Sequence, residues 1–215
     1  MTVMHAITSF AVVAGLMTIT PGLDTTLVLR TAARHSRRAA FATALGINAG
    51  VLAWAVAAAV GVSALLNASQ LAFTVVKVAG AVYMLKLGIT MIHHAIRPPH
   101  GDVATADSLA GVTVPPSATS CFRQGFLTNL MNPKIGAFYV ALLPQFLPPE
   151  HSAAVMGAVL ALVHNVEGLL WFSLIILAVD RMRDLLQRPR VQRSVDAVAG
   201  SAVVGFGLRL GLSRS

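Results

Sequence analysis

The sequence has few charged residues, few acidic residues and a single cysteine. Charged residues make up only 11% of the 215 positions, whereas a soluble domain carries about 25%. This is too little charge to cover a globule, which argues against a soluble enzyme, a nucleic-acid-binding domain and a disordered chain. The lone Cys121 excludes an internal disulfide and a cysteine-based zinc site. We therefore expect an integral membrane protein.

In place of charge the chain has long apolar stretches, and 56% of it is hydrophobic. A helix needs about 20 apolar residues to cross a bilayer core of about 30 Å. None of the stretches alternates with the period of a membrane β-strand, and backbone groups in lipid must be satisfied within their own segment. We predict an all-α membrane protein with six transmembrane helices at residues 10–29, 39–66, 71–92, 121–147, 153–179 and 197–212.

Basic residues gather on alternate connections between these stretches. The connections after the first, third and fifth stretches are rich in arginine, whereas residues 67–70 and 148–152 contain no Lys or Arg. Because cytoplasmic loops carry the excess of Lys and Arg, we predict a cytoplasmic position for the first group and both termini outside. The arginines are Arg30, Arg34, Arg37, Arg38, Arg97, Arg123, Arg181, Arg183, Arg188, Arg190 and Arg193.

The two halves of the sequence share the same order of features. Each half begins with a stretch broken by a proline, Pro21 or Pro133, and continues with one that contains a tryptophan, Trp54 or Trp171. Three spans in each half place the second half upside down relative to the first. Such inverted repeats are typical of secondary transporters, which bind substrate near the midplane where broken helices meet. We predict two three-helix repeats, 1–96 and 121–215, and a cytoplasmic linker at 97–120.

The first break is Thr20-Pro21-Gly22, with Asp24 just after it. Proline removes a helical hydrogen bond and glycine loosens the backbone, which frees polar groups for a substrate or ion. A carboxylate inside a membrane helix usually faces the bundle interior and has a function. Asp24 could bind a substrate ammonium or carry a proton. For the break itself the alternative is a simple kink satisfied by threonines. For Asp24 the alternatives are a structural pair with Lys134 or another basic group, and a position near enough to the cytoplasmic end to be hydrated.

The second break is Asn132-Pro133-Lys134, preceded by Asn129. The Lys134 ammonium could meet a substrate carboxylate, neutralise Asp24 or extend to the cytoplasmic interface. Asn129 and Asn132 offer hydrogen-bond donors and acceptors at the same level. These residues give the second break the polar groups of a binding site.

Glu167 lies within the fifth stretch, three residues after His164, so both side chains share one helix face. They could form a proton relay or a buried hydrogen-bonded pair. We expect no metal site, since the chain has no second pair of this kind, and no cofactor. The candidate residues for substrate binding or coupling are Thr20, Pro21, Gly22, Asp24, Asn48, Asn129, Asn132, Pro133, Lys134 and Glu167.

Asn48 lies between Gly46 and Gly50, a spacing that favours close packing of two membrane helices. Gly207 and Gly211 repeat that spacing near the end of the chain. Either pair of glycines could join two copies in a homodimer or pack two helices of one chain.

Several motifs occur in order along the chain: TPGLD at 20–24, KVAGAVYML at 77–85, FRQGFL at 122–127, NLMNPK at 129–134 and LPQF at 143–146. On these motifs the sequence resembles, over essentially its whole length, the lysine exporter (LysE/RhtB) family of bacterial amino-acid exporters. One departure is Leu23, where that family usually has a second proline.

The resemblance implies a transporter in the bacterial inner membrane that exports amino acids or their derivatives, driven by the proton-motive force. The RhtB branch implies small neutral substrates such as threonine, homoserine and homoserine lactone. The implied partners are therefore a small-molecule amino acid, protons and the lipid bilayer, without nucleic acid. The central motif residues of the family fall on Pro21, Gly22, Asp24, Asn132, Pro133 and Lys134.

Two other classes of function compete with this interpretation. A passive channel, or a subunit of a larger membrane complex for another small solute, is also compatible with paired breaks. An intramembrane enzyme is disfavoured, because the sequence has neither a Gly-x-Ser-x-Gly elbow nor a His-Glu-x-x-His motif.

Overall fold

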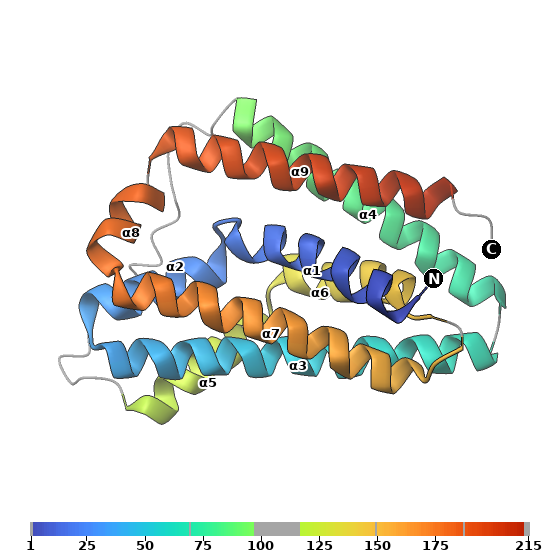
Figure 1. Ribbon diagram of the computed structural model, residues 1–215, viewed down its shortest axis with the longest axis horizontal. Helices are drawn as coiled ribbons and strands as arrows, with labels where there is room; N and C mark the ends of the chain where they lie inside the picture. Colours follow the sequence, from blue (N-terminus) through green and yellow to red (C-terminus); the bar gives the residue numbers. More distant parts are fainter. Residues whose placement is uncertain (1, 69, 97–116, 149, 187, 213–215) are drawn as a thin grey trace.

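The computed structural model describes residues 2–68, 70–96, 117–148, 150–186 and 188–212. In this part of the chain all regular structure is helical, as predicted (Figure 1). The elements are α1 (Val3–Ile19), α2 (Leu23–Arg34), α3 (Arg37–Ala68), α4 (Gln70–Ile96), α5 (Ala118–Leu130), α6 (Pro133–Leu142), the 3₁₀ helix η2 (Leu143–Phe146), α7 (Ala153–Leu177), α8 (Val179–Leu186) and α9 (Pro189–Leu212).

The helices form two outer pairs with two shorter helices between them. In Figure 1, α4 and α9 run side by side along one edge, and α3 and α7 run side by side along the other, with α5 packed on α3. Between these pairs, α1 contacts α7 and α9, and α6 contacts α3 and α4. The helices α1 and α6 therefore connect the two pairs through a shared core.

An apolar core fills the space around α1 and α6. The ring of Phe10 packs against Phe138 and Phe146, with centroids 5.7 and 5.5 Å apart, and all three side chains are buried. Burial of aromatic and aliphatic surface is the main term that holds such a bundle of helices together. This core lies next to both chain breaks and holds their helices in place.

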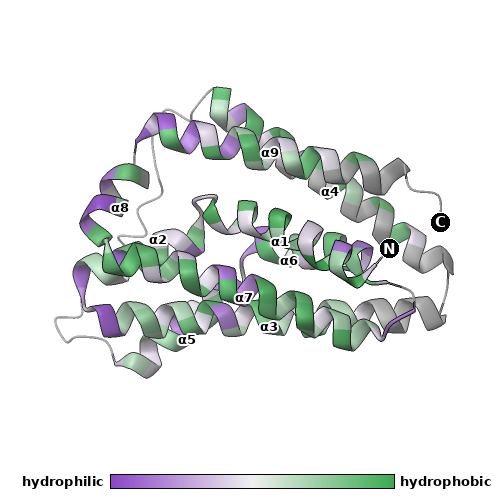
Figure 2. Cartoon of the chain, viewed as in Figure 1, coloured by the Kyte–Doolittle hydropathy of each residue, from purple (hydrophilic) through white to green (hydrophobic). Residues whose placement is uncertain are grey.

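The outer faces of the long helices are apolar as well (Figure 2). On α7, exposed apolar side chains recur every four residues, at Leu162, Val166, Leu170 and Leu174. Soluble proteins rarely expose apolar surface of this extent, and a helix that is apolar all round suits a membrane. These faces therefore match lipid rather than water.

Within the described residues, two helices are long and apolar enough to cross a membrane, Arg37–Gly61 and Ala153–Leu177. The bent pair α1 and α2 passes the same test together, which raises the number to three. At 13 and 10 residues, α5 and α6 are each short for a span on their own. The arrangement with six spans therefore stays a prediction.

Several predicted boundaries are wrong. The predicted connection after α7 contains helix α8 (Val179–Leu186), and α9 begins at Pro189 rather than at residue 197. Arginine favours helix, and proline fits the first helical position, so a polar segment can extend a helix beyond its apolar part. Likewise α5 begins at Ala118, inside the predicted linker, because the Ser117 hydroxyl caps it by accepting from the Ser120 N–H at 3.1 Å.

Two further boundaries differ from the prediction. The helix α1 begins at Val3, seven residues before the predicted span, and its first turn is capped by the Thr2 hydroxyl. The predicted connection at 67–70 is mostly helical, since α3 continues to Ala68 and α4 begins at Gln70. Residues 97–116 of the predicted linker lie outside the described residues.

Helices α3 and α5 approach closely at glycines. A Cβ on Gly46 would overlap the backbone carbonyl of Phe122, and one on Gly125 would overlap the carbonyl of Thr43. One on Gly50 would lie 2.6 Å from Asn129 Oδ1. The glycine pair in α3 therefore packs two helices of one chain, one of the two alternatives that its spacing left open. The surroundings of Gly207 and Gly211 lie outside the described side chains.

We expect Gly46→Ala to lower the midpoint of thermal unfolding of the detergent-solubilised protein, because overpacking costs about 1–3 kcal/mol. Gly61→Ala is the matched control in the same helix, since no described atom outside the adjoining helical backbone lies within 4 Å of a Cβ built there. A Gly46→Ala variant that unfolds at the same temperature as Gly61→Ala would contradict the close α3–α5 packing.

Candidate functional site

The first chain break separates α1 from α2 at Pro21. The two helix axes differ in direction by 53°, and Gly22 begins α2 in an extended conformation without a side-chain cap. Proline has no N–H to continue the helix, so carbonyls at the end of α1 and N–H groups at the start of α2 lose their helical partners. These groups must find partners elsewhere in the protein.

The second break separates α5 from α6 at Asn132. Its side-chain oxygen caps α6 by accepting from the Lys134 N–H at 3.1 Å, and Pro133 takes the first helical position, where a missing N–H costs nothing. The indole N–H of Trp54 on α3 donates to the Asn129 carbonyl at 3.4 Å. The end of α5 and the start of α6 are thereby fixed against α3.

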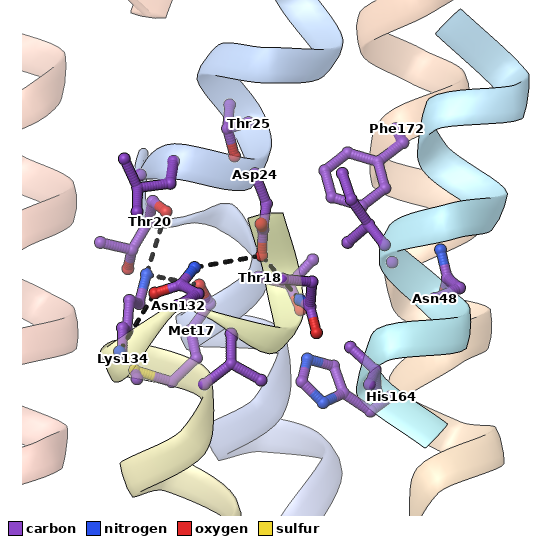
Figure 3. Close-up of a pocket in the computed structure, with 17 residues that line it drawn as sticks. Met17, Thr18, Thr20, Asp24, Thr25, Asn48, Asn132, Lys134, His164 and Phe172 are labelled. Carbon is purple, nitrogen blue, oxygen red and sulfur yellow. Dashed lines mark hydrogen bonds between the residues drawn. The ribbon is translucent and has the colours of Figure 1, made fainter. Parts of the chain in front are cut away.

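The side chain of Lys134 crosses from the second break to the first. Its Nζ donates to the carbonyl oxygens of Met17 and Thr20 at 3.0 and 3.2 Å (Figure 3). These carbonyls lie at the C-terminal end of α1, where a positive charge is favourable. The Lys134 ammonium therefore reaches the first break, and its side chain is directed toward the end of α1.

Asp24 makes the opposite connection, from the first break to the second. Its Oδ2 accepts from the side-chain amides of Asn129 and Asn132 at 2.8 and 3.2 Å (Figure 3). The side chain is only 9% exposed, and its Oδ1 is buried without a hydrogen-bond partner among the residues that the structure describes. In the described hydrogen bonds, Asp24 accepts from two asparagine amides, whereas Lys134 donates to two backbone carbonyls. The two residues are therefore not each other's main hydrogen-bond partner.

A cavity of about 40 Å³ lies between the two breaks. A single water needs roughly 10–15 Å³, so the cavity has room for a few water molecules. Of the predicted candidates, Thr20, Gly22, Asp24, Asn48, Asn129, Asn132 and Lys134 line it. Pro21, Pro133 and Glu167 are not among its lining residues.

The cavity also has a wall on α7 that sequence reasoning did not assign to the site. His164, Gly168 and Phe172 line it together with Thr18 and Thr25. The three α7 residues are four positions apart, which puts them on one helix face. This four-residue spacing is visible in the sequence. It does not by itself indicate a binding site, because a glycine and an aromatic residue at helical spacing are common in ordinary helix packing.

His164 and Glu167 do not form the hydrogen-bonded pair that was one of the two alternatives. The hydroxyl of Tyr139 on α6 lies 2.9 Å from His164 Nδ1, and both side chains are buried. Glu167 instead faces α1, where its Oε1 would lie 3.6 Å from a Cβ on Gly15, and its Oε2 is buried without a partner. Glu167 therefore belongs to the α1–α7 contact rather than to the cavity wall.

Apolar outer faces, two broken helices and charged side chains exchanged between the breaks are together typical of an integral membrane transporter. The LysE type translocator model matches residues 15–214, so the chain belongs to the LysE family of translocators. The resemblance found in the sequence motifs is confirmed.

Relatives with assigned functions are efflux proteins. The chain is 31% identical to the threonine efflux protein of Salmonella typhi over 198 residues, which cover 91% of this chain and 92% of that protein. It is 25% identical to the homoserine/homoserine lactone efflux protein of Salmonella typhimurium over 206 residues, 96% of each chain. No solved structure gives a significant match. Family and relatives together indicate a multi-pass membrane transporter rather than an enzyme.

Asn132 has two roles that substitutions can separate. We expect Asn132→Ala to lose the cap of α6 and the bond to Asp24, whereas Asn132→Ser keeps a capping oxygen and loses only the bond to Asp24. Loss of an N-cap costs about 0.5–2 kcal/mol. Thermal unfolding in detergent should therefore rank wild type above Asn132→Ser, and Asn132→Ser above Asn132→Ala. Equal midpoints for the two variants would show that the cap contributes nothing.

Proposed function

We propose that this protein exports small neutral amino acids or their derivatives, of the threonine, homoserine and homoserine lactone type, from the cytoplasm. The family and the named efflux relatives support export of amino acids. The observation that carries the proposal is the free, buried Oδ1 of Asp24 in a cavity between two broken helices. A buried acceptor without a donor is unfavourable, and a substrate ammonium supplies the donor.

The acceptor side of the proposed site has two oxygens. Asn129 Oδ1 is buried without a partner, like Asp24 Oδ1, and both residues line the cavity. An ammonium group carries three donors in a compact arrangement. It can therefore bind the carboxylate and the amide oxygen together, with the negative charge of Asp24 as its counter-ion.

The donor side of the proposed site is Lys134. Its ammonium has three N–H donors, and the described bonds to Met17 and Thr20 use two of them. The third is available for the substrate carboxylate. Asp24 and Lys134, each held in place by the other break, then bind the two ends of a zwitterion such as threonine or homoserine. Homoserine lactone has no free carboxylate, so it would share only the contact of its ammonium group.

The proposed architecture is six spans in two inverted repeats, residues 1–96 and 121–215 in the sequence pattern. Since α5 already begins at Ala118, the second repeat starts there and the linker shortens to 97–117. Both repeats open with a broken helix, α1–α2 in the first and α5–α6 in the second. The equivalent long helices pair with each other, α3 with α7 and α4 with α9. Pairing of equivalent elements is what a two-fold relation between repeats produces, which supports the proposal.

For the driving force we propose proton coupling through a buried carboxylate. Asp24 lines the cavity, and Glu167 has a buried oxygen without a partner on the neighbouring face of α7. Ionisable residues inside a membrane bundle commonly serve as proton carriers. Uptake of an external proton on either group, followed by its release inside, would drive substrate outward.

We expect Asp24→Asn to abolish efflux while the protein remains in the membrane, because an amide cannot balance the charge of a substrate ammonium. The measurement is loss of labelled amino acids from preloaded cells, with and without a protonophore. Asp184→Asn is the matched control, since Asp184 is exposed on α8. Full efflux in the Asp24→Asn variant would remove Asp24 from the mechanism. Efflux that the protonophore leaves unchanged would refute proton coupling.

The proposed orientation, with both termini outside, is tested by cysteine labelling in spheroplasts. Cys121 is the lone cysteine and is buried, so a Cys121→Ala background gives no label. In that background we expect His151→Cys to react with a membrane-impermeant maleimide in intact spheroplasts, and His35→Cys to react only after permeabilisation. Both histidines are exposed. The reverse pattern would invert the orientation, and labelling of both from outside would contradict the repeat arrangement.

A further inference from the structure

The wall of the cavity opposite the charged groups is uncharged. In Figure 3, Asp24, Asn132 and Lys134 lie toward one side, and Asn48, His164 and Phe172 lie toward the other. Among the described residues that line the cavity, Asp24 is the single carboxylate. If the charged side binds the ammonium and carboxylate of an amino acid, the uncharged wall faces its side chain.

The hydrogen bond between Tyr139 and His164 assigns the state of the imidazole. Both residues are almost fully buried, at 0% and 4% exposure, and the Tyr139 hydroxyl lies 2.9 Å from Nδ1. A phenol has one O–H to donate, and burying it without an acceptor would be costly. We therefore assign Tyr139 as the donor, which makes Nδ1 the acceptor and leaves the proton of the neutral imidazole on Nε2.

Aromatic neighbours hold the imidazole in this orientation. The ring of Tyr139 stacks on it with centroids 5.8 Å apart and planes 16° apart. Phe138 approaches edge-on, with its centroid at 5.6 Å from that of His164. Because His164 Nδ1 is hydrogen-bonded and the imidazole ring is packed on more than one side, the ring is held in place. Its Nε2–H is therefore a fixed donor in the wall of the cavity.

Asn48 supplies an acceptor on the same wall. Its Nδ2 donates to the Ala44 carbonyl at 2.8 Å within α3, so Oδ1 is the free end of the amide. Oδ1 faces Gly168 on α7, where an added Cβ would lie only 3.1 Å away. Glycine at this position therefore lets the Asn48 oxygen approach α7 closely, and both residues line the cavity.

We propose that His164 and Asn48 form a side-chain subsite that selects, among the zwitterionic substrates, those bearing a hydroxyl group, with Tyr139 as a positioning residue for His164. The Nε2–H of His164 donates to the hydroxyl oxygen, and Asn48 Oδ1 accepts the hydroxyl proton. An alkyl side chain of the same shape leaves both buried polar groups unpaired, which a site of this kind penalises. A cationic side chain finds no counter-ion on this wall. This assignment rests on the proposed function and specifies how that site distinguishes substrates.

The test compares matched substrates on the full-length protein in proteoliposomes. Transport of homoserine is measured against 2-aminobutyrate, which lacks the hydroxyl, and threonine against valine, which replaces it with a methyl group. We expect wild type to favour the hydroxylated member by about tenfold in kcat/KM, the factor that corresponds to one hydrogen bond of about 1.4 kcal/mol. His164→Phe and Asn48→Leu should each bring this ratio close to one.

Two further variants separate a direct role from a structural one. His164→Gln keeps a donor and should recover part of the ratio. Tyr139→Phe should lower the ratio between hydroxylated and alkyl substrates, because the imidazole loses the partner that fixes its tautomer. A purely structural role for Tyr139 would lower transport of both substrates equally. His151→Phe, at an exposed position outside the cavity, is the matched control and should keep the wild-type ratio.

The outcomes distinguish this inference from the proposed function. Wild type that transports amino acids but does not favour the hydroxylated ones would overturn the subsite and leave amino-acid export intact. A His164→Phe variant that keeps the full wild-type ratio of hydroxylated to alkyl substrates would likewise overturn the subsite and leave amino-acid export intact. If His164→Phe fails to reach the membrane, the ratios of His164→Gln and Tyr139→Phe decide the question. Absence of transport for every amino acid, in wild type as well, would overturn the proposed function and the subsite with it.

Discussion

The structure depends on an exchange of polar groups between its two broken helices. Lys134 from the second break binds the carbonyls of Met17 and Thr20 at the end of α1, and Asp24 from the first break binds the amides of Asn129 and Asn132. In a bilayer no water is available to satisfy free backbone groups, so irregular backbone persists only where protein supplies the partners. Each break therefore supplies hydrogen-bond partners to the other, and the cavity lies where the two meet.

The sequence predicted the elements of this exchange but not its pairing. Pro21, Pro133, Asp24 and Lys134 stand out because they interrupt apolar stretches. Which partners they take depends on how helices distant in sequence pack together, and local pattern holds no such information. The same limit applies to His164, whose neighbour Glu167 suggested a pair along one helix, whereas its hydroxyl partner belongs to α6. The start of α9 was misplaced because hydropathy marks the apolar part of a helix rather than its end.

The two halves follow one plan without being equivalent in detail. The tryptophans occupy corresponding helices, yet Trp54 donates to the Asn129 carbonyl and covers Gly136, where a Cβ would lie 2.7 Å from its ring, whereas the indole nitrogen of Trp171 is buried without a partner. The second break is therefore anchored to α3 more firmly than the matching pattern in the sequence suggests. The likeness between the halves predicted the position of the tryptophans, but not what they do.

The size of the cavity has a consequence for how binding is measured. About 40 Å³ holds a few water molecules, which is less space than an amino acid occupies, so the described conformation is closed on its site. A ligand that binds only an open conformation has an apparent dissociation constant equal to the intrinsic one divided by the open fraction. The measured affinity then combines the free energy of opening the protein with the free energy of the contacts to the ligand. A substitution that loosens helix packing would tighten apparent binding without touching the ligand.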